Sequence, residues 1–79
     1  MSRRDDVTTV LESGGWVIDR FAKSRKYRVL FHPDKQNKYY LGRSGAVRFG
    51  KNISQSISRT DNLNFKYLAE KAAAIRATI

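Results

Sequence analysis

Lysine and arginine side chains, which bind phosphate and carboxylate groups, are concentrated in the middle of this chain. Residues 20–51 contain ten lysines and arginines and one acid, Asp34, and so carry a net charge of +9. The remaining residues balance six cations with six acids, so this segment accounts for the whole formal charge. Six of the nine aromatic residues lie in the same segment. A cationic, aromatic-rich centre is typical of a surface that binds a polyanion, and nucleic acid is the commonest polyanion.

The first group of these cations surrounds a predicted turn at Ala22–Arg25, between two short strands. Cations on a turn can straddle phosphates, and the N–H groups of the turn supply further donors. In the second group, between Lys38 and Lys51, cations are interleaved with the aromatic residues Tyr39, Tyr40 and Phe49. Neighbouring strand residues face opposite ways, so a buried Leu41 would bury Tyr39 and expose Tyr40. An exposed tyrosine on a basic sheet can stack on a base, which contributes about 1–3 kcal/mol.

These two groups together predict one nucleic-acid-binding face. Its predicted residues are Arg20, Lys23, Arg25, Lys26, Arg28, Lys38, Tyr40, Arg43, Arg48 and Lys51.

Catalytic and metal-binding residue types are scarce. The chain has no cysteine, which excludes disulfides, thiolate metal sites and a cysteine nucleophile. His32, the single histidine, stands before Pro33 without a neighbouring nucleophile or second base in the sequence. The segment Gly42–Gly45 lacks the Gly-Lys-Ser/Thr ending of a phosphate-binding loop. We therefore predict no catalytic residues, no metal site and no cofactor.

The pattern of apolar residues predicts an α+β fold. Ser2 and Asp5 favour the start of a short helix, which Gly14 and Gly15 end. Alternating patterns then predict an antiparallel meander of three or four strands, over residues 16–21, 26–32, 38–41 and 46–49. Residues 51–60 are expected to be extended.

The last segment predicts a helix that packs on one face of the sheet. Asp61 or Asn62 is expected to cap it, and a stripe at helical spacing follows. The stripe consists of Phe65, Leu68, Ala72, Ile75 and Ile79. Trp16 is expected to be a core residue between the first helix and the sheet.

The length of 79 residues predicts a single domain, 1–79, that buries about 60% of its unfolded surface. No apolar run of about 18 residues is present, and the charged N-terminus is not followed by the apolar stretch of a signal peptide. We therefore expect a cytoplasmic protein that does not enter membranes. The stripe on the last helix favours a monomer or a weak homodimer.

Residues 7–34 contain pieces of a known pattern: a helix running into Gly15-Trp16, then Ser24 in a basic turn, then a strand that ends in His32-Pro33. This order resembles the HicA-type toxins, small basic ribonucleases with a double-stranded-RNA-binding-like fold. In that family the catalytic histidine follows the serine, and here Arg25 follows Ser24. The resemblance therefore implies the fold and a basic face of nucleic-acid size, without that catalytic residue.

Residues 27–50 are similar to the arm-binding domains of phage integrases, which lay a three-stranded sheet in the major groove. The Tyr-Tyr-Leu-Gly-Arg string at 39–43 would suit one strand and turn of such a sheet.

Three functions remain open from the sequence, and non-catalytic nucleic-acid binding is the first of them. The alternative is a small adaptor or inhibitor of phage or mobile-element type, whose basic face docks on an acidic host protein. The third is a HicA-like ribonuclease that uses His32.

Overall fold

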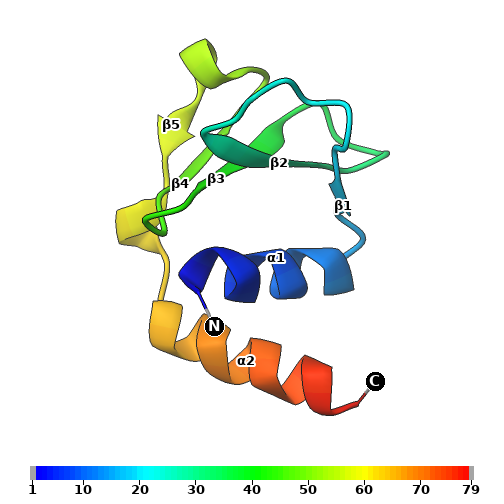
Figure 1. Ribbon diagram of the computed structural model, residues 1–79, viewed down its shortest axis with the longest axis vertical. Coiled ribbons are helices and arrows are strands. Elements are labelled where there is room, and N and C mark those ends of the chain that lie inside the picture. Colours follow the sequence, from blue (N-terminus) through cyan, green and yellow to red (C-terminus); the bar gives the residue numbers. More distant parts are fainter. Residues whose placement is uncertain (1, 79) are drawn as a thin grey trace.

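A five-stranded antiparallel sheet and two helices make up the computed structural model, which describes residues 2–78 (Figure 1). The strands pair in the order in which they occur along the chain. The elements are α1 (Arg3–Ser13), β1 (Val17–Ile18), β2 (Tyr27–Phe31), β3 (Lys38–Gly42), β4 (Val47–Gly50), the 3-10 helix η1 (Ile53–Gln55), β5 (Ile57–Ser58), the 3-10 helix η2 (Thr60–Asn62) and α2 (Phe65–Ala77). The predicted α+β fold, in which one helix precedes an antiparallel meander in the chain and another follows it, is therefore confirmed, with five strands in place of three or four.

The first helix begins and ends where the sequence predicts. The Oγ atom of Ser2 accepts a hydrogen bond from the backbone N–H of Asp5 at 3.1 Å, which satisfies one free donor of the first turn. The helix ends before Gly14, and Gly15 has a φ of 94°, a conformation that favours glycine. The chain can therefore reverse directly into β1.

The core lies between α1 and the near face of the sheet. In the register, Leu30 of β2 pairs with Tyr39 of β3, and Leu41 of β3 pairs with Val47 of β4. Leu30, Leu41 and Val47 are almost fully buried, and Val7 of α1 completes the cluster. Trp16 is half-buried against this core, with its ring 4.6 Å from that of Tyr39, so its predicted place is confirmed.

The second helix lies along α1, and α1 separates most of it from the sheet (Figure 1). Its first turns still reach the core, because Phe65 and Leu68 pack against the buried cluster. Ala72 is completely buried. Asn64 caps the helix by accepting from the N–H of Tyr67 at 3.1 Å. The predicted caps Asp61 and Asn62 were wrong, since both belong to η2. Of the predicted stripe, Ile79 lies outside the described residues.

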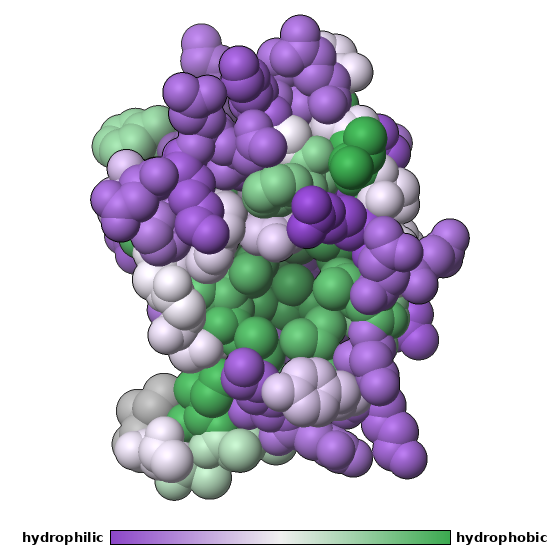
Figure 2. Space-filling model, turned by 180° about the vertical axis from the view of Figure 1, so that it is seen from behind, coloured by the Kyte–Doolittle hydropathy of each residue, from purple (hydrophilic) through white to green (hydrophobic). Residues whose placement is uncertain are grey.

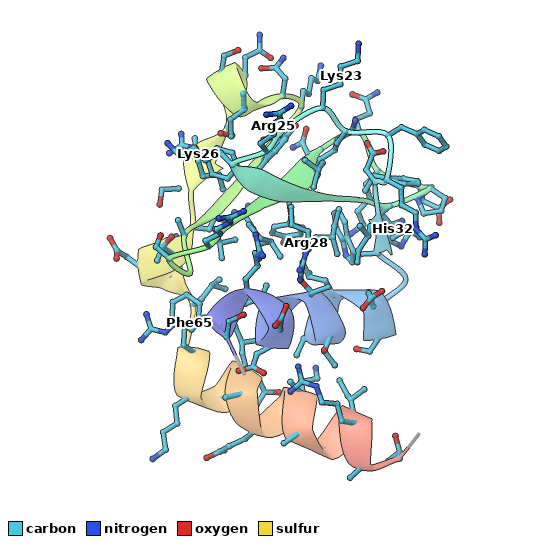
Figure 3. All side chains as sticks on the ribbon, viewed as in Figure 1. Lys23, Arg25, Lys26, Arg28, His32 and Phe65 are labelled. Atoms are coloured by element: carbon cyan, nitrogen blue, oxygen red, sulfur yellow. The ribbon has the colours of Figure 1, made fainter. Side chains whose placement is uncertain are left out.

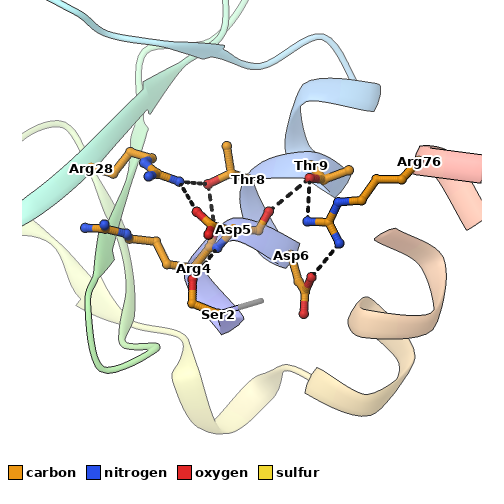
Figure 4. A network of polar contacts seen from close by, with 8 residues as sticks. All are labelled: Ser2, Arg4, Asp5, Asp6, Thr8, Thr9, Arg28 and Arg76. Atoms are coloured by element: carbon orange, nitrogen blue, oxygen red, sulfur yellow. Dashed lines mark hydrogen bonds and ion pairs between the residues drawn. The ribbon is translucent and has the colours of Figure 1, made fainter. Parts of the chain in front are cut away.

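Two arginines hold α1 between its neighbours (Figure 4). Arg28 of β2 donates to the carboxylate of Asp5 at 2.9 Å and to the hydroxyl of Thr8 at 3.0 Å. Arg76 of α2 donates to the carboxylate of Asp6 at 2.9 Å and to the hydroxyl of Thr9 at 3.0 Å on the other side of the helix. The polar residues of α1 therefore connect the sheet to α2.

Residues 51–60 are only partly extended. The side chain of Asn52 accepts from the N–H of Gln55 at 2.9 Å and winds η1, after which β5 pairs with β4. The short η2 then begins at Thr60. The expectation of a continuous extended segment was therefore wrong, because an asparagine that bonds to its own backbone starts a turn.

The sheet face opposite the helices is also partly covered. The chain between β1 and β2 arches over β2 (Figure 1). The segment after β4 lies across from it on the same face. Val29 and Tyr40 are buried on this face. From behind, apolar surface crosses the middle of the molecule, and hydrophilic side chains gather beyond the sheet (Figure 2). Among the described residues, no helix has the length and apolar character that crossing a membrane requires.

Candidate nucleic-acid interface

Four of the predicted cations lie on one loop between β1 and β2, which we call the basic loop (residues 20–26). Asp19 anchors its start: its N–H donates to the carbonyl of Val29 at 2.8 Å, and its carboxylate accepts from the N–H of Phe21 at 3.0 Å. Ser24 anchors its end by accepting from the N–H of Tyr27 at 3.1 Å. The four cations are all exposed, and they are Arg20, Lys23, Arg25 and Lys26.

The basic loop points away from the helices. Lys23, Arg25 and Lys26 lie at the end of the molecule beyond the sheet, whereas Arg28 points toward α1 (Figure 3). Because a side chain must reach solvent to meet a phosphate, this arrangement separates binding candidates from structural residues.

The turn between β3 and β4 meets the basic loop. Gly45, with a φ of 94°, closes this turn, and its N–H donates to the carbonyl of Gly42 at 3.1 Å. Arg43 is exposed on the turn, and together with Arg25 and Lys26 it lines an open hollow of about 600 Å³. The fold therefore brings two cation groups, separated in sequence, to the same hollow.

Three predicted binding residues are engaged within the protein. Arg28 bonds to α1 as described, and Arg48 donates from Nε and Nη2 to the hydroxyl and carbonyl of Ser56, both at 2.7 Å. The ammonium of Lys38 lies 3.8 Å from the carboxylate of Asp19. Arg28 and Arg48 are also half-buried, and we therefore place both outside the exposed surface.

The expectation that Tyr40 is exposed was wrong. The side chain is 7% exposed, and its hydroxyl donates to the carbonyl of Lys51 at 3.2 Å. Burial raises the pKa of Tyr40 above its ordinary value of 10.0, and the nearby Asp19 charge acts in the same direction. The strand alternation itself holds, but both faces of the sheet are covered at this point, so facing away from the helices does not expose the ring.

His32 lies apart from the basic loop, at the end of β2. Its Nδ1 accepts from the N–H of Asp34 at 3.1 Å, and its ring contacts Trp16 edge-to-face at 5.4 Å between centroids. Within residues 2–78, no three potential metal ligands come together.

One exposed aromatic residue of the loop was missed by the sequence analysis. Phe21 is 94% exposed and stands one position after Arg20 and two before Lys23. It had been assigned to a strand, but β1 ends at Ile18. The available signal was Asp19, whose carboxylate can bond to the N–H two residues ahead and start a turn.

Six of the predicted binding cations thus remain on the exposed surface, and we call them the outer cations: Arg20, Lys23, Arg25, Lys26, Arg43 and Lys51. In the part of the chain that the structure describes, no carboxylate forms an ion pair with any of them. Their charge is therefore free to attract an anionic partner.

Comparison of the chain with protein-family models, with curated proteins and with solved structures returned no match. The resemblances to HicA-type toxins and to integrase arm-binding domains therefore stay predictions.

Proposed function

We propose that this protein binds nucleic acid without catalysing a reaction on it, and that the outer cations contact the phosphates. The observation that carries this proposal is the meeting of Arg25 and Lys26 with Arg43 around one open hollow. Phosphate groups along a strand present charge at short intervals, so cations clustered in this way can contact several of them.

The acid nearest to the basic loop does little to cancel this charge. The carboxylate of Asp19 already accepts the N–H of Phe21 and lies beside the ammonium of Lys38. It therefore positions the loop and leaves the outer cations unneutralised. Such a surface favours a polyanion over a neutral partner.

The experiment is a fluorescence-anisotropy titration of labelled single-stranded and duplex DNA and RNA at several salt concentrations. Binding should weaken steeply with salt, because each phosphate contact releases counterions, with a log–log slope of about −0.9 per contact on duplex DNA. The double variant Arg25→Ala/Lys26→Ala should bind more weakly. The magnitude of its slope should fall by the equivalent of about two phosphate contacts.

A matched control removes two cations elsewhere. Lys66 and Lys71 are exposed on α2, so Lys66→Ala/Lys71→Ala lowers the net charge equally without touching the basic loop. Its slope should stay at the parental value. Equal effects of the two double variants would contradict a localised interface.

An acidic protein partner is the other outcome of this test. In that case the parent protein would bind none of the four nucleic acids at low salt. One acidic protein would instead co-purify with it. Both interactions depend on salt, so the identity of the retained molecule decides between them.

A further inference from the structure

A second hollow adjoins the first, on the sheet face opposite the helices. This outer groove has a volume of about 400 Å³ and lies between the basic loop on one side and Asn52 with Ile53 on the other. Tyr27 lines both hollows, so they lie side by side.

The floor of the outer groove is apolar and closely packed. Val29 and Tyr40 are buried there, and Tyr27 packs edge-to-face on Tyr40 with 6.5 Å between ring centroids. The hydroxyl of Tyr40 donates to the carbonyl of Lys51, which ties the far wall to the sheet. The groove is therefore built before any ligand arrives, which lowers the entropy lost on binding.

The rim carries an aromatic ring that is not packed into the core of the protein. Phe21 lines the groove, yet its side chain is 94% exposed. The hydrogen bond from its N–H to Asp19 holds the backbone from which the ring extends. Ile53, 42% exposed, supplies apolar surface on the opposite wall.

Charge completes the match to one kind of ligand. Lys23 belongs to the lining, and Arg20 precedes Phe21 on the basic loop. Asp19 and Lys38 also line the groove, and there they pair with each other. An aromatic rim, an apolar floor and flanking cations are the groups that hold a nucleotide, whose base is flat and apolar on its faces and whose phosphate is anionic.

We propose that the outer groove binds one unpaired base of a single-stranded nucleic acid, with Phe21 stacked on the base and Lys23 on an adjacent phosphate. The proposal rests on the function proposed above. A base within a duplex has both faces covered by its neighbours, whereas an unpaired base offers a free face to an aromatic ring. The groove therefore favours single strands, while the outer cations contact phosphates in either form.

The test compares Phe21→Ala with the parent protein on a single-stranded oligonucleotide and on a duplex of equal length. Loss of the ring should weaken single-strand binding roughly 5- to 150-fold, the range measured for base–aromatic stacking. Duplex affinity and both salt slopes should stay unchanged, because no cation is removed. Phe21→Trp should restore single-strand binding, since a larger ring also stacks.

Ile57→Ala is the matched control, because Ile57 is another exposed apolar side chain (61%) but lies on β5 and does not line the groove. It should leave single-strand affinity at the parental value.

Two results would overturn the inference and leave the proposed function intact. One is parental single-strand affinity of Phe21→Ala, and the other is an equal loss on single strand and duplex. In both cases the Arg25→Ala/Lys26→Ala variant would still bind more weakly than the parent. Failure of the parent protein to bind any nucleic acid would instead overturn the proposed function, and this inference with it.

Discussion

The guanidinium of Arg28 lies 2.9 Å from the carboxylate of Asp5, and this ion pair joins the middle of the sheet to the first turn of α1 (Figure 4). In the sequence, Arg28 stands only two positions from Lys26 and has the same kind of charge. Arg28 lies in β2 and points toward the helix, whereas Lys26 lies before the strand, on the basic loop, and reaches solvent (Figure 3).

Replacing Arg28 by alanine should therefore affect stability more than binding. The pair is partly exposed, so we expect a loss of about 1 kcal/mol, including the bond to Thr8, and a fall in Tm of about 4–8 °C. Thermal unfolding followed by circular dichroism measures the change. Lys26→Ala is the control, and it should weaken nucleic-acid binding while leaving Tm at the parental value. Parental Tm together with weaker nucleic-acid binding would place Arg28 in the interface instead.

The same pair predicts how stability responds to acid. The hydrogen bond from Arg28 lowers the pKa of Asp5 below its ordinary value of 3.8, with smaller contributions from Ser2 and the nearby arginine charges. Because the folded-state pKa is the lower one, this stabilisation is present above pH 3.8 and is lost as the pH falls through the folded value. Denaturant unfolding between pH 7 and 2 should show a shallower acid loss for Asp5→Asn than for the parent.

Asp61→Asn is the control for this pH effect, since Asp61 is exposed in η2. Its acid profile should follow that of the parent protein. If Asp5→Asn and the parent lose stability in parallel below pH 4, the ion pair does not contribute.

Tyr40→Phe should destabilise the protein. The variant removes the bond to the carbonyl of Lys51, and a buried hydrogen bond of this kind contributes about 1 kcal/mol. Tyr39→Phe is matched in chemistry and should have a smaller effect, since Tyr39 is less buried. Equal urea midpoints for the two variants would contradict the role of the Tyr40 hydroxyl.

Gly50→Ala should lower stability more than the addition of one methyl group usually does. An added Cβ at Gly50 would lie 2.6 Å from the Cα of Ser56, and backbone cannot move aside as a side chain can. We expect a loss of about 1–3 kcal/mol in denaturant unfolding. Gly14→Ala is the control, because its Cβ would meet no atom closer than 3.4 Å. A parental midpoint for Gly50→Ala would show that the segment after β4 is free to shift.

The order of helices and central strands could be predicted because local signals agree. Ser2, Gly14 and Gly15 mark α1, and the alternation around Leu30 and Leu41 marks β2 and β3. Such signals depend on neighbours within a few residues, which a sequence displays directly.

The candidate site was harder to predict, because exposure depends on contacts between distant segments. The sequence cannot show that Asn52 and Ile53 cover the face that holds Tyr40, or that Asp5 meets Arg28. Counting cations locates the charged segment of the sequence and no more. Only the fold separates Arg28 and Arg48, which hold the protein together, from Arg25 and Arg43, which remain exposed.

The ion pair between Asp6 and Arg76 joins residues that are 70 positions apart. During synthesis α1 leaves the ribosome early, and it cannot make this contact until Arg76 has also emerged. The sheet, whose strands each pair with the next in sequence, can form in the meantime. The strands can therefore pair through contacts that are close in sequence before α2 packs on α1, so closing the long loop between the two helices is expected to be the last step of folding.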